Sequence, residues 1–318
     1  LPMPTVVLQD LVSNPELNGL SGQAVEFNPD THCFRVVLSD GKGDLSVRFD
    51  NLVFAENIES AFQEIAIRGK GIGLVAISKI SKEELVIEEE LVLRHNPPPS
   101  TEEPWTEAEI KSLVQSFDAL PEEVQKQVLA LHITGLQSGL DRTQTIMHIF
   151  SSNCFAMDPE ADGLFLKTSR FNHSCLPNCS WAVDAGAMAS IRVVAMREIE
   201  KGEELSLSYV SFWKSSLERK QYLLDGYNFS CECSVCSLPP AALAESNARR
   251  TRYDQLEDSV DALEDQQKFS EALVALQAMM DILREERHEN PTIFFYIASK
   301  ALTICRLMGA TSEREKWF

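Results

Sequence analysis

The spacing of hydrophobic and polar positions changes several times along the chain, and the first part of the chain is rich in predicted strands. Residues 5–56 contain short apolar runs, and the two runs in HCFRVVLSDGKGDLSVRF flank the turn residues SDGKGD, which is typical of a β-hairpin. We therefore predict a small five-stranded barrel of about fifty residues. In residues 62–95 the apolar positions alternate or cluster in short bursts around glycines, which predicts strand, turn and strand.

Helical spacing begins after the breaker-rich stretch NPPPSTEEPW. In WTEAEIKSLVQSFDALPEEVQKQVLALHITGL the apolar residues recur three and four positions apart, and Pro121 marks the start of a second helix. Residues 150–212 return to strands and irregular loops, whereas residues 241–318 are helical almost throughout, with a break at Pro291. Antiparallel helix pairs of this length are the unit of TPR-like arrays. The likeness is one of architecture, because the sequence has no clear repeat of about 34 residues.

Composition narrows the class of protein. The chain has 318 residues, of which 44% are hydrophobic, so two or three domains with a substantial core are expected. The formal net charge of −19 disfavours direct DNA binding, which needs a basic face, and favours a basic ligand. Simple solubility would explain the charge equally well. The sequence has no run of eighteen apolar residues, so we expect no membrane association.

The cysteines divide into a cluster and scattered residues. Cys231, Cys233 and Cys236 supply three thiols within six residues, and a structural zinc site takes four ligands. Cys175 is the best candidate for the fourth ligand, because it lies in the irregular, proline-containing segment RFNHSCLPNC. The alternative is a set of buried cysteines near a turn. The remaining cysteines are interpreted as buried free thiols, which predicts a reducing, intracellular compartment, the nucleus or the cytoplasm; they are Cys33, Cys154, Cys179 and Cys305.

One motif is misleading. GIGLVA at 71–76 matches the dinucleotide-binding pattern G-x-G-x-x-[GA], and acidic residues follow at 88–90. That pattern requires a helix directly after its glycines, whereas ISKISKEELVIEE alternates as a strand does. We therefore reject a dinucleotide-binding fold.

Four motifs together carry a family resemblance. They are GKGIGLVA at 69–76, RFNHSCLPN at 170–178, GEELSLSY at 202–209 and YNFSCECSVC at 227–236. In this order and at these intervals they resemble the SET-domain protein lysine methyltransferases, over about residues 62–238. The branch that the chain resembles most is the SET-and-MYND group. It departs from that group because residues 62–150 contain no cysteine, so the MYND zinc finger is absent.

The resemblance implies an α+β fold. We expect a SET-domain β-fold of small sheets with a pseudo-knot and a helical insertion, preceded by a small SH3-like β-barrel and followed by a TPR-like α-helical domain. The expected bounds are 1–58 for the barrel, 59–95 for the N-terminal part of the SET domain, 96–150 for the insertion, 151–214 for the C-terminal SET core, 215–240 for the post-SET zinc segment and 241–318 for the helical domain.

The implied activity is transfer of methyl groups from S-adenosylmethionine to the side-chain amine of lysine in a histone or another protein, with S-adenosylhomocysteine as product. The amine must be neutral to attack, and neutralising a free lysine at pH 7 costs about 4–5 kcal/mol. An apolar channel and a nearby sulfonium charge both lower the pKa of the substrate lysine. The site therefore needs aromatic side chains more than a strong base. The alternative function is a catalytically inactive SET scaffold that binds protein partners through its barrel and helical tail.

The same resemblance assigns residues to roles. Tyr209 matches the catalytic tyrosine, and Phe155 and Tyr227 match the walls of the substrate channel. The expected cofactor-binding residues are Lys70, Gly71, Ile72, Gly73, Asn153, Ser169, Phe171, Asn172, His173, Tyr209 and Phe229. The expected ligands of one structural Zn²⁺ are Cys175, Cys231, Cys233 and Cys236. Partners are expected to be basic, lysine-bearing proteins, and the chain is expected to be a monomer.

The start of the helical tail is strongly acidic. We expect the tail to pack against the SET domain and to leave a deep acidic cleft that draws basic segments toward the channel. A solvated helix face is the alternative interpretation of this run. The run consists of Asp254, Glu257, Asp258, Asp261, Glu264 and Asp265.

Overall fold

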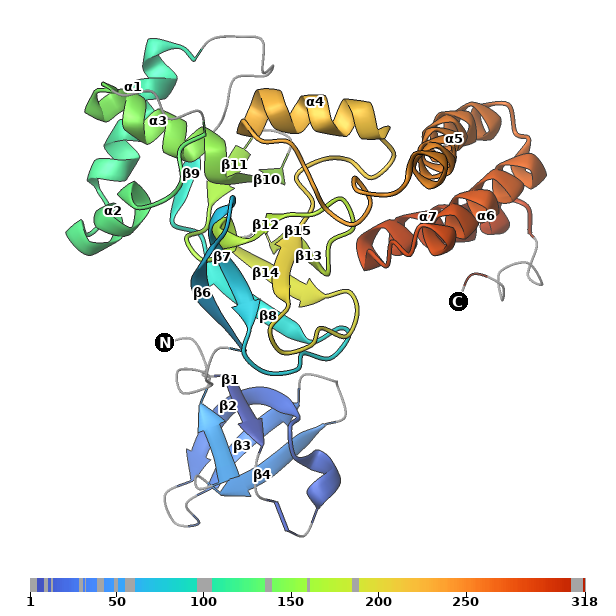
Figure 1. Cartoon of the computed structure of the whole chain (residues 1–318). Coiled ribbons are helices and arrows are strands. Elements are labelled where there is room, and N and C mark those ends of the chain that lie inside the picture. Colours follow the sequence, from blue (N-terminus) through green and yellow to red (C-terminus); the bar gives the residue numbers. More distant parts are fainter. Residues whose placement is uncertain are drawn as a thin grey trace. The chain divides into compact units, whose positions relative to one another are not determined.

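The computed structural model of this chain divides into two compact units, residues 1–60 and residues 61–318 (Figure 1). It describes residues 5–8, 11–12, 14–28, 31, 33–38, 43–48, 51–54, 61–95, 105–134, 139–158, 161–184, 189–309 and 317. The second unit combines several small sheets with helices, so the α+β prediction is confirmed.

The first unit is one antiparallel sheet of five strands in the order β4-β3-β2-β1-β5. The strands are β1 (Thr5–Leu8), β2 (Ser21–Asn28), β3 (Cys33–Leu38), β4 (Asp44–Arg48) and β5 (Leu52–Phe54), with a short 3-10 helix at Pro15–Leu17. The predicted hairpin is confirmed by the pairing of β3 with β4, although most of its turn lies outside the described residues. Alternate side chains such as Val36 and Leu38 form the core of this unit. An SH3-like closure of the sheet stays a prediction.

Three small sheets form the centre of the second unit. Their orders are β12-β15-β7-β6, β13-β14-β8 and β10-β11-β9. The strands are β6 (Phe62–Ile67), β7 (Gly71–Ala76), β8 (Leu85–Glu90), β9 (Leu93–His95), β10 (Cys154–Asp158), β11 (Ala161–Leu164), β12 (Asn172–His173), β13 (Cys179–Asp184), β14 (Ser190–Ala195) and β15 (Glu204–Leu207). Apolar side chains from the first two sheets, among them Leu74, Val193 and Leu205, share one core. Because GIGLVA forms strand β7, the rejection of a dinucleotide-binding helix is confirmed.

The insertion contributes three helices, which lie on one side of the small sheets in Figure 1. They are α1 (Glu107–Asp118), α2 (Glu122–Leu129) and α3 (Arg142–Asn153). Capping boxes begin α1 at Thr106 and α3 at Asp141, and α2 begins directly after Pro121, as predicted. Buried side chains such as Phe117 and Ile149 form a core of their own with strand β9.

Helix α4 (Ser216–Tyr227) follows the last strand and leads into the cysteine cluster. A capping box at Ser215 and Glu218 begins it, and Asn228 ends it in the left-handed conformation with φ of 55°. The chain then turns through Cys231–Cys236 before the helical tail begins.

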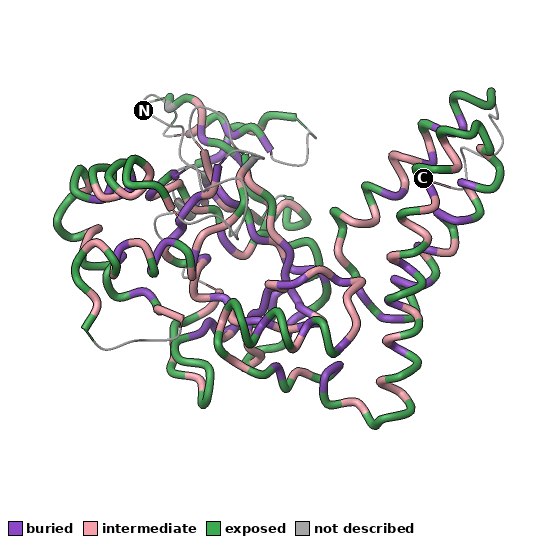
Figure 2. Tube along the Cα trace, turned by 90° about the horizontal axis from the view of Figure 1, so that it is seen from above, coloured by how far each residue is buried: buried purple, intermediate pink, exposed green. Residues whose placement is uncertain are grey.

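The tail consists of α5 (Pro240–Asp265), α6 (Phe269–Glu285) and α7 (Pro291–Leu307). Figure 2 shows that the buried positions of these helices lie where the helices face one another. The tail packs against the rest of the second unit through Arg250, whose Nη1 donates to the Phe212 carbonyl at 2.7 Å. A TPR-like classification of the tail stays a prediction.

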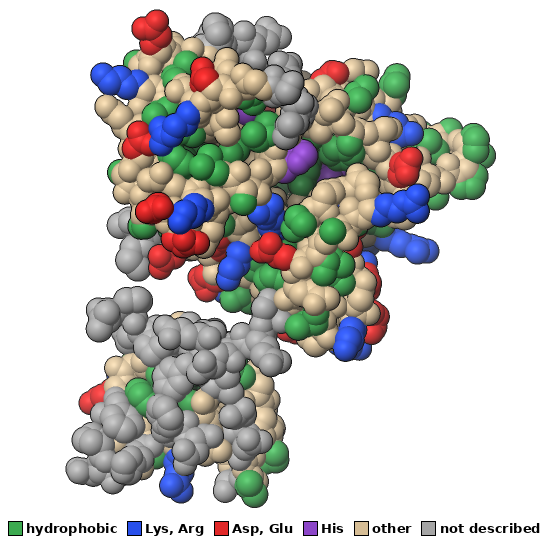
Figure 3. Space-filling model, turned by 60° about the vertical axis from the view of Figure 1, so that its left-hand side comes forward, with side chains coloured by type: hydrophobic (Ala, Val, Ile, Leu, Met, Phe, Trp, Pro, Cys, Tyr) green, Lys and Arg blue, Asp and Glu red, His purple; other side chains and the backbone are tan. Residues whose placement is uncertain are grey.

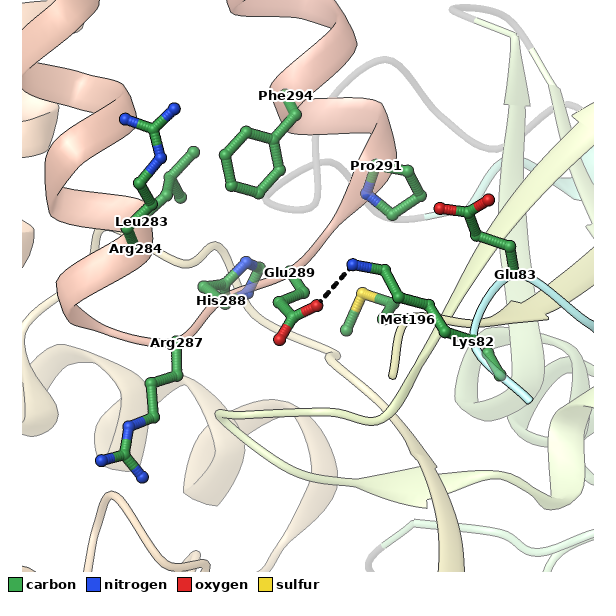
Figure 4. A pocket seen from close by; sticks show the side chains of 11 residues that line it. Lys82, Glu83, Met196, Leu283, Arg284, Arg287, His288, Glu289, Pro291 and Phe294 are labelled. Carbon is green, nitrogen blue, oxygen red and sulfur yellow. Dashed lines mark hydrogen bonds and ion pairs between the residues drawn. The ribbon is translucent and has the colours of Figure 1, made fainter. Parts of the chain in front are cut away.

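A cavity of about 540 Å³ lies between the tail and the turn that precedes β8 (Figure 4). Its lining contains Lys82, Glu83, Arg284, Arg287 and Glu289, with Lys82 and Glu289 paired at 2.7 Å. The contact between the tail and the rest of the second unit is as predicted. The acidic character predicted for the space between them is wrong for this cavity, because cations and acids line it together. Two acids of the run on α5, Asp261 and Glu264, instead pair with Lys300 of α7.

The scattered cysteines are free thiols, as are the clustered ones. Cys179 and Cys305 are buried, but the prediction of burial is wrong for Cys33 and Cys154, which are partly exposed. Among the described residues, none of the helices is both long and apolar enough to span a membrane.

Candidate active site and metal centre

A parallel pairing of two short strands joins motifs that are far apart in the sequence. Asn172 pairs with Ser206 and His173 with Leu207, so the NHSC segment lies beside the strand that leads to Tyr209. The Tyr209 amide donates to His173 Nδ1 at 3.0 Å. Because Nδ1 accepts this bond, Nε2 carries the ring proton and points toward Cys175 Sγ at 3.3 Å.

Asn178, which sequence analysis did not single out, holds the same strands in register. Its Nδ2 donates to the Glu204 carbonyl at 2.9 Å, and its Oδ1 accepts from the Ser206 amide at 2.8 Å. The side chain is buried, so both bonds are shielded from water. Its position at the end of RFNHSCLPN was the available signal.

These elements enclose a cavity of about 610 Å³. Nine residues with predicted roles line it, which are Lys70, Gly71, Asn172, His173, Tyr209, Tyr227, Phe229 and two of the predicted metal ligands, Cys231 and Cys233. Sequence analysis missed His132 and Ile133, which the helical insertion adds to the wall. Figure 3 shows a hollow in which histidine and hydrophobic side chains gather. A concave, mostly apolar site with a few polar groups is the usual form of a small-molecule site.

Tyr209 lies at the aromatic end of this cavity. Its ring centroid is 4.9 Å from that of Tyr227 and 5.3 Å from that of His173, and its hydroxyl donates to the Phe171 carbonyl. Burial raises the pKa of Tyr209, and the neighbouring Tyr227 adds to this shift. The phenol is therefore neutral at physiological pH. Burial lowers the pKa of His173 to about 4, so this imidazole is neutral as well.

The glycine-rich turn before β7 forms another side of the cavity. Gly69 and Gly71 both have φ of +78°, a conformation that residues with a side chain rarely adopt. At Gly73 a β-carbon would lie 2.4 Å from Asn172 Nδ2, so only glycine admits the asparagine side chain there. Lys70 Nζ is bonded to Glu204 Oε2 at 2.6 Å, and this pair lies at the cavity.

The structure places the other predicted cofactor residues outside the cavity lining. Asn153 donates to the carbonyls of His132 and Ile149, and thereby supports the wall from behind. Ser169 donates to the carbonyls of Asn153 and Phe165. Phe171 is buried and contributes its carbonyl to Tyr209, whereas Ile72 is an exposed residue of β7.

Phe155, predicted to wall the substrate channel, lies apart from the cavity lining. Its ring makes edge contacts with Phe165 at 6.0 Å and Trp181 at 5.3 Å. Trp181 is a second aromatic residue of this neighbourhood, and sequence analysis did not identify it.

The four predicted metal ligands come together beside the cavity. The sulfurs of Cys175, Cys231, Cys233 and Cys236 all lie within 4.8 Å of one another. The separations from Cys175 are 3.9 Å to Cys231 and 3.6 Å to Cys236. A tetrahedral zinc site with bonds of about 2.3 Å holds its sulfurs about 3.8 Å apart. The donor set therefore fits one zinc ion.

An arginine that sequence analysis missed contacts this cluster. Arg219 of α4 has no solvent exposure, and its Nε donates to Cys175 Sγ at 3.2 Å. Its Nη2 lies 4.0 Å from Cys236 Sγ, and its Nη1 donates to the Lys214 carbonyl at 2.5 Å. The available signal was its spacing of four from the apolar Leu223, which puts both on the buried face of the helix.

Comparison with known proteins shows a similarity that centres on the middle of the chain. Residues 71–210 match the family model of the SET domain. Histone-lysine N-methyltransferase set5 of Schizosaccharomyces pombe is 28% identical over 198 residues, which are 61% of this chain and 57% of that protein. Histone-lysine N-methyltransferase SMYD3 of Mus musculus is 31% identical over 48% of this chain and 35% of that protein. N-lysine methyltransferase SMYD2 of Gallus gallus is 26% identical over 64% of this chain and 47% of that protein. The matches thus span between about a third and somewhat more than half of the length of these relatives.

Proposed function

We propose that this chain, whose residues 71–210 match the family model of the SET domain, transfers methyl groups from S-adenosylmethionine to lysine side chains of a protein substrate. The observation that carries the proposal is the position of Tyr209. Its neutral hydroxyl is held by the Phe171 carbonyl, beside Tyr227 and the Asn172–His173 pair, at the wall of a cavity of suitable size. An inactive scaffold is not supported, because the relatives are named as methyltransferases.

The cavity fits S-adenosylmethionine in its polar groups as well as its volume. Asn172 Nδ2 is buried and has no hydrogen-bond partner among the residues that the structure describes, which costs stability unless a ligand atom meets it. Lys70, now bonded to Glu204, is a cation that could pair with the carboxylate of the cofactor. The ring of Phe229 supplies a surface for the adenine. When bound, the cofactor supplies an electrophilic methyl on a sulfonium sulfur.

The residues of this chain would orient the reaction and keep water away from it. Tyr209 and Tyr227 both have a pKa raised first by burial, so neither would act as a strong base. Their role would be to align the amine and to surround it with aromatic surface that favours its neutral form. Phe155 would extend this surface on the substrate side.

We propose Zn²⁺ as the metal of the four-cysteine centre, with a structural role. All four ligand positions of a tetrahedral ion would be taken by thiolates, so no position is open for chemistry. The ion would hold Cys175 of the NHSC segment to the segment that carries Phe229.

Further assignments stay predictions. We propose that residues 1–58 form an SH3-like barrel and residues 241–318 a TPR-like domain. The basic nature of the substrate, the absence of DNA binding and the monomeric state are likewise proposed from charge and resemblance.

A labelled-methyl assay tests the proposal. The full chain is incubated with isotopically labelled S-adenosylmethionine and either core histones or whole-cell lysate, and the modified residue is identified by mass spectrometry. The proposed activity is supported if the natural chain labels a lysine and the Tyr209→Phe variant does not. Label on another residue type, or none at all with a chain that binds the cofactor, contradicts it.

A further inference from the structure

Arg219 presents a problem of charge. Its guanidinium is permanently charged and has no solvent exposure, and a buried charge without a counter-charge is strongly destabilising. In the part of the chain that the structure describes, no carboxylate lies within ion-pair distance of Arg219. Its three contacts are two cysteine sulfurs and the Lys214 carbonyl. The counter-charge must therefore come from the sulfurs.

A second buried arginine approaches from the helical tail. Arg250 of α5 also has no solvent exposure, and its Nε donates to Glu286 Oε2 at 2.9 Å. Its Nη1 donates to the Phe212 carbonyl at 2.7 Å, and its guanidinium lies over the Phe212 ring at 4.5 Å. Burial lowers the pKa of Arg250, and the positive charge of Arg219 lowers it further.

The two arginines hold the same short segment. Arg219 binds the Lys214 carbonyl and Arg250 binds the Phe212 carbonyl, and both carbonyls lie within five residues of Tyr209. Tyr209 itself is fixed on its other side by His173, whose ring points to Cys175. The residues that make these contacts are themselves bound to the cysteine cluster, as Arg219 and His173 are, or belong to the tail, as Arg250 does.

We propose that Arg219 is the counter-charge of the four-cysteine metal centre, and that Arg219 and Arg250 are positioning residues through which the metal holds residues 209–214 and the helical tail in place. A zinc ion with four thiolates carries a net charge of −2, and this charge offsets the buried Arg219, whereas Arg250 has Glu286 as a counter-charge of its own. The positioning role rests on the proposed function of Tyr209, whereas the link from metal to tail does not.

The first experiment compares variants of the full zinc-loaded chain by release of zinc to a chromogenic chelator. Arg219→Gln should release zinc about 10- to 100-fold faster than the natural chain, the range usual for loss of a group that supports metal ligands. Arg219→Lys keeps the positive charge but lacks the several N–H donors of the guanidinium, and its rate of zinc release should lie much closer to that of the natural chain. Lys220→Gln removes a cation from the next position of α4 and is the matched control, expected to release zinc at the natural rate. Natural release rates in Arg219→Gln would overturn the proposal.

Hydrogen exchange tests the link to the tail without relying on activity. Arg250→Gln should release zinc at the natural rate but lose protection in residues 209–214 and at the start of α5. Removal of zinc from the natural chain should reduce protection in the same two places while β13 and β14 keep theirs. These exchange measurements test the link between metal and tail even if Arg219→Gln does not fold. Full protection of α5 after zinc removal, or uniform loss throughout residues 61–318, would overturn the proposal.

Measurements of kcat and KM test the positioning role of Arg219 and Arg250 separately from the proposed function. In a chain that methylates lysine, Arg219→Lys should lower kcat and change the KM for S-adenosylmethionine less than twofold. If no methylation is found at all, the zinc and exchange results still test the link between metal and tail. Unchanged kcat in Arg219→Lys and Arg250→Gln would remove the positioning role.

Discussion

His288 makes the stability of the second unit depend on pH. It lies at the corner between α6 and α7, is 3% exposed, and its ring centroid is 4.4 Å from that of Phe212. Burial first, and then the positive charge of Arg250, lower the pKa of His288 to about 4 from the ordinary value of 6.5. The unfolded chain therefore binds a proton below pH 6.5, whereas the folded chain binds it only near pH 4.

The sign and size of the effect follow from this difference. Between pH 4 and 6.5 the unfolded state binds more protons, so stability is fully present above pH 6.5 and is lost as the pH falls toward 4. A shift of about 2.5 pKa units corresponds to about 3 kcal/mol in total, of which about 2 kcal/mol is lost by pH 5.

Denaturant unfolding at pH 7.5 and pH 5.0 measures this loss. His288→Gln cannot take up the proton, so its stability should fall by about 2 kcal/mol less than that of the natural chain between the two pH values. His148→Gln removes an exposed histidine of α3 and should keep the natural difference. If His288→Gln and the natural chain lose the same stability, burial of His288 does not govern the acid response.

Other variants test the site itself. Tyr209→Phe should bind S-adenosylmethionine normally by calorimetry but lose about a hundredfold or more in turnover, because it lacks the hydroxyl that donates to the Phe171 carbonyl; equal turnover would refute the catalytic role. Metal analysis should find about one zinc per chain, and Cys233→Ser should lose it; a folded, active chain free of metal would contradict the zinc assignment. Gly73→Ala should weaken cofactor binding because its β-carbon would displace Asn172, whereas Gly226→Ala, with open space around the position, should bind normally. Equal cofactor affinity in the two alanine variants would show that the close approach at Gly73 is unimportant.

The cysteine cluster and the strands could be predicted from sequence, because the cysteines can be counted against the four ligands of zinc and the strand signals are local. Three thiols within six residues leave one tetrahedral position, and few cysteines could fill it. Alternation and turn residues are local as well, so the β3–β4 hairpin and strand β7 follow from their own residues. The nearness of Asn172 to Tyr209 is different, because it depends on a parallel pairing across more than thirty residues. Only the family resemblance indicated it.

What sequence analysis missed depends on tertiary charge and packing. Arg219 looks like an ordinary helix residue until the cysteines that surround it are known. Asn153 matched a binding position by motif, but its amide is occupied by the carbonyls of His132 and Ile149. The acidic run on α5 suggested a cleft, yet the partner of Asp261 and Glu264 is Lys300, about forty residues later in the chain.

The separation of 56 residues between Cys175 and Cys231 sets an order of events during synthesis. Ribosomes add about 5–20 residues per second, so Cys175 exists for about 3–11 s before the first of its partner thiols is made. Tyr209 is added late in that interval, 22 residues before Cys231, and the nascent chain then contains Tyr209 before the four thiols can come together. The last of the four motifs to be translated therefore completes the cysteine cluster, and premature termination just before Cys236 would leave a chain that contains Asn172, His173 and Tyr209 but lacks one of the four thiols.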